Sequence, residues 1–190
     1  MTVSATGGEK RVRDDLQEIL LDATTLAVRI EQLGQEIARD YADNVPVCIC
    51  ILRGAAPFLT DLTRATPIHL QIDYMAVSSY GGATRTSGVV RILKDLETSI
   101  EGRHVIIVED IVDSGLTLAY LRDQLLRRQP ASLKICALLR KDCPRVVDVP
   151  IDYLGFDIPD RFVVGYGLDY RQLYRNLPYV GVLRPEAIQE

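Results

Sequence analysis

The sequence predicts an α/β fold in which a parallel sheet is flanked by helices. Short continuous apolar runs at 47–52, 105–108 and 135–139 are typical of strands that are buried on both faces. Segments with apolar residues at helical spacing precede and separate these runs, and such alternation is typical of a parallel sheet with helices on both sides. Ligands of such sheets bind beyond the carboxyl ends of the strands, so the residues after each run are the first candidates for a site.

The first helix is expected after Asp22, a suitable N-cap. Its apolar positions recur at spacings of four, three, four and four: Leu26, Ile30, Leu33, Ile37 and Tyr41. Residues 1–20 before it are read as a polar, frayed segment. After the strand at 47–52, Pro57 is expected to open a short helix over 57–65.

Further elements follow in the same manner. Alternation over 68–76 predicts a half-exposed strand, and the glycine-rich stretch 78–88 is expected to be a mobile lid. The run at 105–108 predicts a strand, and a helix marked by Leu118, Leu121 and Leu125 follows it. Strands are then expected at 135–139 and 153–156, with shorter apolar pieces near 162 and 180.

Composition sets the class of protein. The 190 residues are 47% hydrophobic and 25% charged, with a net charge of −4, which is typical of one globular domain over 1–190. No run approaches the roughly 18 apolar residues of a membrane span, and the first fifteen residues lack the apolar core of a secretory signal. A pI near 5.3 argues against nucleic acid as a partner. We therefore expect a cytoplasmic protein.

The four cysteines do not match a zinc site. Cys48 and Cys50 form C-x-C, whereas paired zinc ligands usually have two to four residues between them, and the spacing of Cys136 and Cys143 is also unsuitable. The expected role is that of small buried apolar residues in a reducing compartment.

The segment VIIVEDIVDSGLTL at 105–118 carries the strongest chemical signal. Four apolar residues are expected to bring Glu109 and Asp110 to the end of a strand, and a turn over 113–117 then leads into a helix. Free amides at a helix start favour a phosphate, to which Ser114 and Thr117 add hydroxyl donors. Adjacent carboxylates accept hydrogen bonds from a ribose diol, and a divalent cation would relieve their repulsion.

Each residue of this segment, taken singly, could have a purely structural role. An acidic residue after a strand is often an N-cap, and a glycine in such a turn is common. Three acidic residues together, however, would be costly without a ligand or cation. There is no G-x-x-x-x-G-K-[ST] motif and no G-x-G-x-x-G after a strand, and His69 and His104 leave little material for a Ser-His-Asp triad.

The segment resembles the phosphoribosyl-pyrophosphate-binding motif of type I phosphoribosyltransferases, especially the bacterial hypoxanthine-guanine enzymes. The resemblance spans about residues 20–185. It includes LRGA at 52–55, SSYG at 78–81, LLRK at 138–141 and RFVVGYGLDY at 161–170. It implies the type I phosphoribosyltransferase fold: a central parallel sheet flanked by helices, with a small hood subdomain from the chain ends over the purine. It also implies a homodimer or homotetramer.

The activity implied is purine salvage, in which N9 of hypoxanthine or guanine displaces pyrophosphate from phosphoribosyl pyrophosphate to give IMP or GMP. By this resemblance, Asp113 is the catalytic residue that handles the proton of the base at N7. The phosphoribosyl group would be bound by Glu109, Asp110, Asp113, Ser114, Gly115, Leu116 and Thr117. Glu109, Asp110 and Asp169 would hold Mg²⁺.

The resemblance assigns the remaining residues to the purine and to pyrophosphate. Purine contacts are expected from Lys141, which would recognise the 6-oxo group, and from Phe162, Val163 and Asp169. Pyrophosphate contacts are expected from Arg53, Gly54, Ser79, Tyr80 and Arg175, and the 52–53 peptide is often cis in the family. From the residues alone, Lys141 could be a solvated loop lysine, Phe162 a core aromatic and Asp169 a turn residue.

Two features depart from the family pattern. Arg53 stands where relatives often carry lysine, and Ser114 replaces the commoner threonine; charge and hydroxyl are kept. Two rival functions stay open at this point. One is a xanthine-preferring phosphoribosyltransferase, and the other is a regulator that senses phosphoribosyl pyrophosphate without catalysis.

Overall fold

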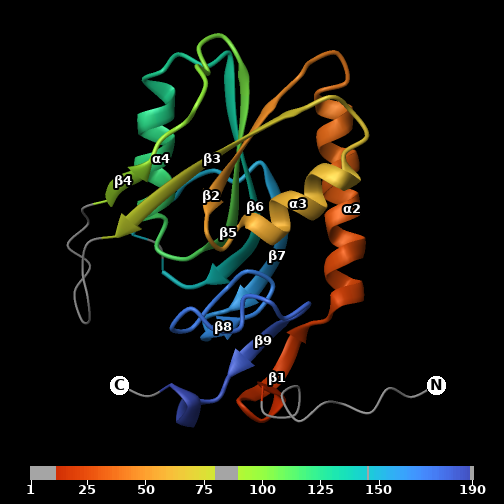
Figure 1. Ribbon diagram of the computed structural model, residues 1–190, viewed down its shortest axis with the longest axis vertical. Helices are drawn as coiled ribbons and strands as arrows, with labels where there is room; N and C mark the ends of the chain where they lie inside the picture. The colour runs from red at the N-terminus through yellow and green to blue at the C-terminus, as the bar shows by residue number, and fades with distance from the viewer. Residues whose placement is uncertain (1–11, 80–89, 145, 189–190) are drawn as a thin grey trace.

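Helices separate the first three described strands, and also the fifth and sixth, in the computed structural model, which describes residues 12–79, 90–144 and 146–188 (Figure 1). The first half contains β1 (Leu16–Leu21), α2 (Ala23–Asp40), β2 (Val47–Leu52), α3 (Ala56–Ala65), β3 (Gln71–Ser79) and β4 (Val90–Lys94). The second half contains β5 (His104–Val112), α4 (Leu116–Leu126), β6 (Ser132–Asp142), β7 (Tyr153–Pro159), β8 (Val163–Val164), β9 (Val180–Leu183) and a 3₁₀ turn (Pro185–Ala187).

The large sheet has six strands in the order β4-β3-β2-β5-β6-β7. All neighbouring pairs are parallel except β3 and β4, which run antiparallel at one edge. The carboxyl ends of the parallel strands therefore meet along one edge of the sheet. The predicted α/β fold with a central parallel sheet is confirmed.

Helices cover both faces of this sheet, which explains the continuous apolar runs. Along β2, Cys48 and Cys50 pack in the core that also contains residues of α2 and α3, whereas Val47 and Ile49 pack in the core that contains α4. Every residue of β2 up to Ile51 is buried. A strand with apolar neighbours on both sides loses the polar alternation that marks a half-exposed strand.

The first helix follows the prediction closely. Asp22 caps α2, since its Oδ1 accepts a hydrogen bond of 2.7 Å from the amide of Thr25. The five residues at helical spacing are all buried: Leu26, Ile30, Leu33, Ile37 and Tyr41. Pro57 lies in the first turn of α3, as expected.

A small antiparallel sheet, β1-β9-β8, lies next to the carboxyl ends of the large sheet (Figure 1). Both ends of the chain contribute to it. Val163, Val180 and Val182 from this sheet belong to the same core as α2 and α3. The small sheet is thus packed directly over the edge at which ligands of a parallel sheet bind.

Several boundaries differ from the sequence prediction. Residues 16–21, expected within a polar frayed start, form β1; only Leu16 is fully buried there, so the strand lacks a clear apolar pattern. The strand expected from 68 begins at Gln71, and β4 was not foreseen. Of the lid expected at 78–88, residues 78 and 79 belong to β3 because they pair with β4, and 80–88 lie outside the described residues.

Cys48, Cys50 and Cys136 are buried free thiols, and Cys143 is partly exposed. Among the described helices, none combines the length and apolar character needed to cross a membrane.

Candidate active site

Two adjacent hollows lie at the carboxyl ends of β5 and β6. The smaller, about 100 Å³, is lined by Glu109, Ile111, Val112, Asp113, Ser114, Gly115, Thr117 and Leu118. The larger, about 290 Å³, is lined by Asp110, Ile111, Asp113, Lys141, Phe162, Val163, Leu168 and Asp169. Because Ile111 and Asp113 line both hollows, a ligand with two parts could occupy them together. Most of the side chains singled out from the sequence are gathered here.

The acid pair Glu109–Asp110 lies inside β5 and not after it. β5 continues to Val112, and Glu109 is in register with Ala137 of β6. The expected end of this strand at 108 is therefore wrong. Acidic residues are uncommon in strands, which is why the sequence pattern placed the boundary too early.

Burial within the sheet makes the acid pair electrostatically unusual. Burial and the neighbouring charge of Asp110 raise the pKa of Glu109 well above its usual value. Within the described part of the chain, Glu109 Oε2 is buried without a hydrogen-bond partner. Burial also raises the pKa of Asp110 to about 6, although backbone amides and Arg175 oppose the shift. Such carboxyls are favourable places for a cation or for hydroxyl donors.

Gly54 lets the backbone after β2 approach the acid pair closely. A Cβ at this position would lie 1.7 Å from Asp110 Oδ2. Gly167 packs against Gly54 in turn: its φ is +100°, and a Cβ there would lie 2.0 Å from the carbonyl oxygen of Gly54. Any side chain at either position would force these three segments apart.

The turn from Asp113 to Thr117 joins β5 to α4. Gly115 adopts φ +79°, and a Cβ there would lie 2.2 Å from the carbonyl oxygen of Val147. The carbonyl oxygen of Ser114 accepts hydrogen bonds from the amides of Val146 and Val147, at 3.1 and 3.2 Å. The backbone of Val146 and Val147 therefore holds this turn in place. The first amides of α4, which lack partners within the helix, are the natural donors to an anion in the smaller hollow.

Lys141 lies in β6, which extends to Asp142, and not just past a strand as expected. Its Nζ is 3.5 Å from Asp113 Oδ2 and 3.2 Å from Asp160 Oδ1, and its side chain is only 15% exposed. This burial argues against a solvated loop lysine. Cys143 Sγ donates to Asp113 Oδ1 at 3.3 Å, so Asp113 contacts the side chains of both Lys141 and Cys143.

Phe162 is exposed, unlike an aromatic residue of the core. Its side chain is 43% exposed, and its ring meets Tyr170 edge to face with centroids 5.7 Å apart. Neighbouring Val163 is buried in β8. An exposed ring on the wall of a hollow is well suited to stack on a planar ligand.

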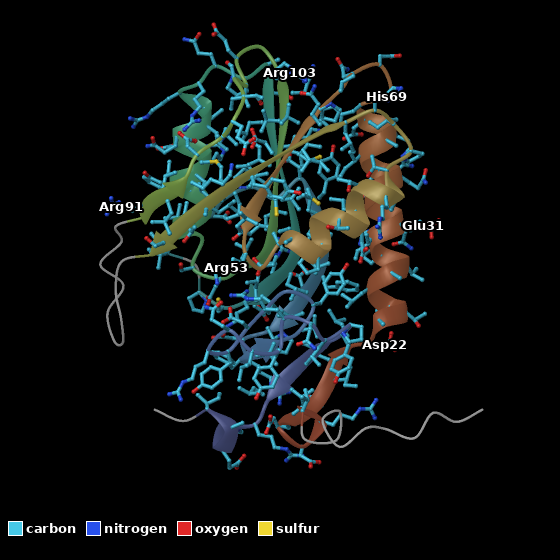
Figure 2. All side chains as sticks on the ribbon, viewed as in Figure 1. Asp22, Glu31, Arg53, His69, Arg91 and Arg103 are labelled. Carbon is cyan, nitrogen blue, oxygen red and sulfur yellow. The ribbon has the colours of Figure 1, made fainter. Side chains whose placement is uncertain are left out.

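A cluster of charged residues forms the rim beside Gly54. The side chain of Arg53 lies at the end of the large sheet that faces the small sheet (Figure 2), and the Leu52–Arg53 peptide is cis. Arg175 forms a 2.6 Å ion pair with Asp169 and donates to the carbonyl oxygen of Gly167 at 2.7 Å. Asp169 therefore connects this rim to the larger hollow.

The structure does not describe the side chains of two residues expected near pyrophosphate, Ser79 and Tyr80. Ser79 is the last residue of β3. Tyr80 lies outside the described residues, as does most of the expected lid.

The acid pair and Asp169 have the donor chemistry that Mg²⁺ prefers. Within residues 12–79, 90–144 and 146–188, no three His, Cys, Asp or Glu side chains converge into a metal-ligating group. Mg²⁺, however, is usually held by one or two carboxylates together with substrate oxygens and water. The unpartnered Glu109 oxygen fits this mode of binding.

Three residues near the site were missed from the sequence: Cys143, Asp160 and Gln172. Asp160 comes shortly before Phe162, and its acidity beside a candidate lysine was an available signal. Gln172 has φ +67° without being glycine, and nothing in the sequence marks such a position. Cys143 was assigned to the buried thiols, whereas it is partly exposed at the rim.

Comparison with known proteins gives one consistent result. The pattern of the phosphoribosyl transferase domain matches residues 17–171. A hypoxanthine-guanine phosphoribosyltransferase of Streptococcus thermophilus is 49% identical over 172 residues, which cover 90% of this chain and 96% of the relative. The Mycobacterium avium enzyme of the same name is 52% identical over 182 residues, covering 93% and 90%. A crystal structure of a hypoxanthine phosphoribosyltransferase from Staphylococcus aureus matches with a TM-score of 0.91 and 46% identity, covering 95% and 98%.

Proposed function

The chain belongs to the phosphoribosyltransferase family, and from this premise we propose which of its residues bind and activate each substrate. It is an enzyme of purine salvage that transfers the phosphoribosyl group of phosphoribosyl pyrophosphate to hypoxanthine or guanine, giving IMP or GMP and pyrophosphate. The observation that carries our residue assignment is that two hollows share Asp113. One offers donors for a phosphate, and the other combines a lysine with an exposed aromatic ring.

We place the 5′-phosphate of the phosphoribosyl group in the smaller hollow and its ribose where the two hollows meet, between Glu109 of the smaller and Asp110 of the larger. The amides of residues 113–117 and the hydroxyls of Ser114 and Thr117 would bind the 5′-phosphate. Glu109 and Asp110 would accept hydrogen bonds from the two ribose hydroxyls, since a carboxylate is an acceptor only. This contact would satisfy the Glu109 oxygen that has no partner in the described structure.

The purine would occupy the larger hollow. Lys141 Nζ would donate to the 6-oxo group while Asp113 and Asp160 hold the ammonium in place. Adenine presents a 6-amino donor to the same ammonium, and sites built on such hydrogen bonds reject the mismatched analogue strongly. Phe162 would stack on the purine, with Val163 and Asp169 completing the wall.

The reaction requires a proton acceptor near the base and a binding site for the leaving group. As N9 forms a bond to C1′, the bond from C1′ to the pyrophosphate oxygen breaks, and the electron pair leaves with pyrophosphate. Asp113 would accept the proton that the base releases at N7. Positioned proton transfer of this kind contributes about 10²–10⁴ in rate.

Pyrophosphate would be bound by Arg53, the backbone at Gly54 and Arg175, because guanidinium groups match phosphate oxygens in charge and shape. Ser79 and Tyr80 would close over the reacting atoms and exclude water. Glu109, Asp110 and Asp169 would hold Mg²⁺, which when bound neutralises charge on the pyrophosphate.

We further propose one domain over 1–190 that works in the cytoplasm as a homodimer or homotetramer. Three buried free thiols suit a reducing compartment. Ile72 and Tyr74, alternate residues on one face of β3, are 44% and 39% exposed, which suits burial against a second copy. Light scattering on the purified protein measures the number of subunits.

A spectrophotometric assay with phosphoribosyl pyrophosphate, Mg²⁺ and each of four purines tests the base site. We expect turnover with hypoxanthine and guanine, and little or none with adenine. Turnover with adenine in preference to hypoxanthine would contradict the role of Lys141. A preference for xanthine would identify the substrate as different from the one proposed.

A further inference from the structure

Gln172 connects the two arginines assigned to pyrophosphate. Its Oε1 accepts a hydrogen bond from Arg53 Nη1 at 3.0 Å and another from Arg175 Nη2 at 3.2 Å. Arg53 follows β2, whereas Arg175 lies far along the chain, in the segment between β8 and β9. One amide oxygen thus joins guanidinium groups from two separate segments.

The position of Gln172 is itself fixed by the site. Its backbone amide donates to Asp169 Oδ2 at 2.8 Å, while Oδ1 of the same carboxylate pairs with Arg175. Gln172 is also held in a tight turn, in which Tyr170 and Leu173 exchange backbone hydrogen bonds of 3.3 and 3.0 Å. The backbone of Gln172 adopts φ +67°, a conformation that residues other than glycine rarely adopt.

The oxygen that joins the two arginines, Gln172 Oε1, belongs to a neutral amide. An amide oxygen holds the two guanidinium groups near each other without adding negative charge to that of Asp169, which already pairs with Arg175. A carboxylate of the same shape would form ion pairs with both and would repel an incoming pyrophosphate. A neutral hydrogen bond is also weaker than a charge-assisted one, so an anionic phosphate oxygen can replace it.

We propose that Gln172 is a positioning residue for the pyrophosphate subsite. It holds Arg53 and Arg175 at one separation before phosphoribosyl pyrophosphate binds, and a phosphate oxygen takes its place between them in the complex. The inference rests on the proposed function, because it uses the assignment of both arginines to pyrophosphate. It adds a residue that never contacts the reacting atoms.

Two variants of nearly equal size separate the effects of hydrogen bonding and charge. Gln172→Met removes the acceptor, and Gln172→Glu makes it anionic. We expect Gln172→Met to raise the KM for phosphoribosyl pyrophosphate and the inhibition constant of pyrophosphate about 3- to 10-fold, as for the loss of a single hydrogen bond. Gln172→Glu should raise both further, by about 10- to 100-fold, because it adds a negative charge between the two arginines that competes with and repels the phosphate oxygens. The KM for hypoxanthine should stay within about twofold in both variants, since a lost pyrophosphate contact leaves base binding unchanged.

Leu173→Met is the matched control, because Leu173 lies in the same turn and its side chain is 62% exposed. Parental kinetics in this control, with parental unfolding temperatures in all three variants, would support a specific role for Gln172. An equal rise in the KM for phosphoribosyl pyrophosphate in Leu173→Met would overturn the inference, since the turn as a whole would then be responsible.

Arg53→Met and Arg175→Met distinguish failure of this inference from failure of the proposed function. If both arginine variants raise the KM for phosphoribosyl pyrophosphate while both Gln172 variants leave it unchanged, the inference is overturned and the arginines keep their role. If neither arginine variant changes this KM, the pyrophosphate assignment fails, and the role of Gln172 fails with it.

Discussion

Carboxyl groups at the two ends of the large sheet have opposite environments and opposite pKa shifts. At the amino end of β6 and β7, Asp40 accepts hydrogen bonds of 2.7 Å from Lys134 and 2.5 Å from the Tyr153 hydroxyl. These partners lower the pKa of Asp40. At the carboxyl end, burial raises the pKa of Glu109 and Asp110, and Glu109 keeps a buried oxygen without a partner in the described residues.

The difference indicates that Asp40 at the amino end contributes to stability, whereas the acid pair at the carboxyl end serves binding. Lys134 also lies over the rings of Tyr41 and Tyr153, with its Nζ 5.4 and 5.1 Å from the centroids, so the charge of Asp40 at the amino end is matched by a cation that two rings also contact. The Tyr41 hydroxyl at this end is buried without a hydrogen-bond partner in the described residues, but it carries no charge. The acid pair at the carboxyl end is costly in the free protein, and substrate hydroxyls or a cation would relieve that cost. The buried carboxyls of raised pKa at the carboxyl end therefore mark the place where a ligand would complete the structure.

The largest effect is expected from Asp113→Asn. Its amide cannot accept a proton from the base, so kcat should fall about 10²–10⁴-fold. The Asp113 side chain is 60% exposed, and the unfolding temperature should therefore change little. Steady-state kinetics together with thermal unfolding measure both. Retention of the parental kcat would remove Asp113 from the chemistry.

Lys141→Met should act mainly on the base. Loss of a charged donor to the 6-oxo group is expected to lower kcat/KM for hypoxanthine about 10- to 100-fold. The dissociation constant of phosphoribosyl pyrophosphate should change much less, because Lys141 lines only the larger of the two hollows. Binding measured by calorimetry, beside kinetics with varied hypoxanthine, tests this separation. Equal losses for both substrates would contradict it.

Asp110→Asn should stabilise the free protein while weakening substrate binding. Burial raises the pKa of Asp110 from 3.8 to about 6, so the folded state binds more protons than the unfolded state between these values, and stability falls as pH rises through this window. At pH 7 the variant should be more stable by on the order of 1–3 kcal/mol. Below about pH 4 this difference should vanish.

Urea unfolding at pH 4, 5, 6 and 7 measures this dependence. For the parental enzyme, protonation of Asp110 below about pH 6 should also raise the KM for phosphoribosyl pyrophosphate. If the difference in unfolding free energy between the parental protein and Asp110→Asn does not change with pH, titration of Asp110 is not its cause.

Lys134→Met tests the opposite end and should have the smallest effect. Since Lys134 and Asp40 are both about a third or more exposed, loss of the ion pair and ring contacts should cost only about 1 kcal/mol of stability. Asp40 has a lowered pKa, so this contribution is present above 3.8 and is lost as pH falls through the lowered value. This pH dependence is opposite in sign to that of Asp110.

Unfolding of the Lys134 variant at the same pH values, together with its kinetics, checks both expectations. Kinetic constants equal to those of the parental enzyme are expected. A large loss of activity without loss of stability would mean that the two ends of the sheet are coupled.

The sequence predicted those parts of the fold whose residues obey a single dominant pattern. The apolar face of α2 and the doubly buried β2 are examples, since helical spacing and a continuous apolar run each point to one kind of element. β1 was missed because only one of its six residues is buried, and β5 was cut short because Glu109 and Asp110 are poor strand formers. Long-range pairing with β9 and β6 overrides these local preferences.

The candidate site was predictable where a motif is local. Residues 109–117 are contiguous, and the resemblance to known phosphoribosyltransferases placed Lys141, Phe162 and Asp169. The contact between Asp160 and Lys141, and the bridge from Gln172 to Arg53, depend on how distant segments meet. No spacing in the sequence encodes such contacts.

A crystal structure of the enzyme with IMP and Mg²⁺ tests the central claim most directly. We expect the 5′-phosphate on the amides of residues 113–117, the ribose hydroxyls on Glu109 and Asp110, and the 6-oxo group on Lys141. A nucleotide bound elsewhere on the molecule, with both hollows empty of it, would contradict the assignment of this edge of the sheet as the active site.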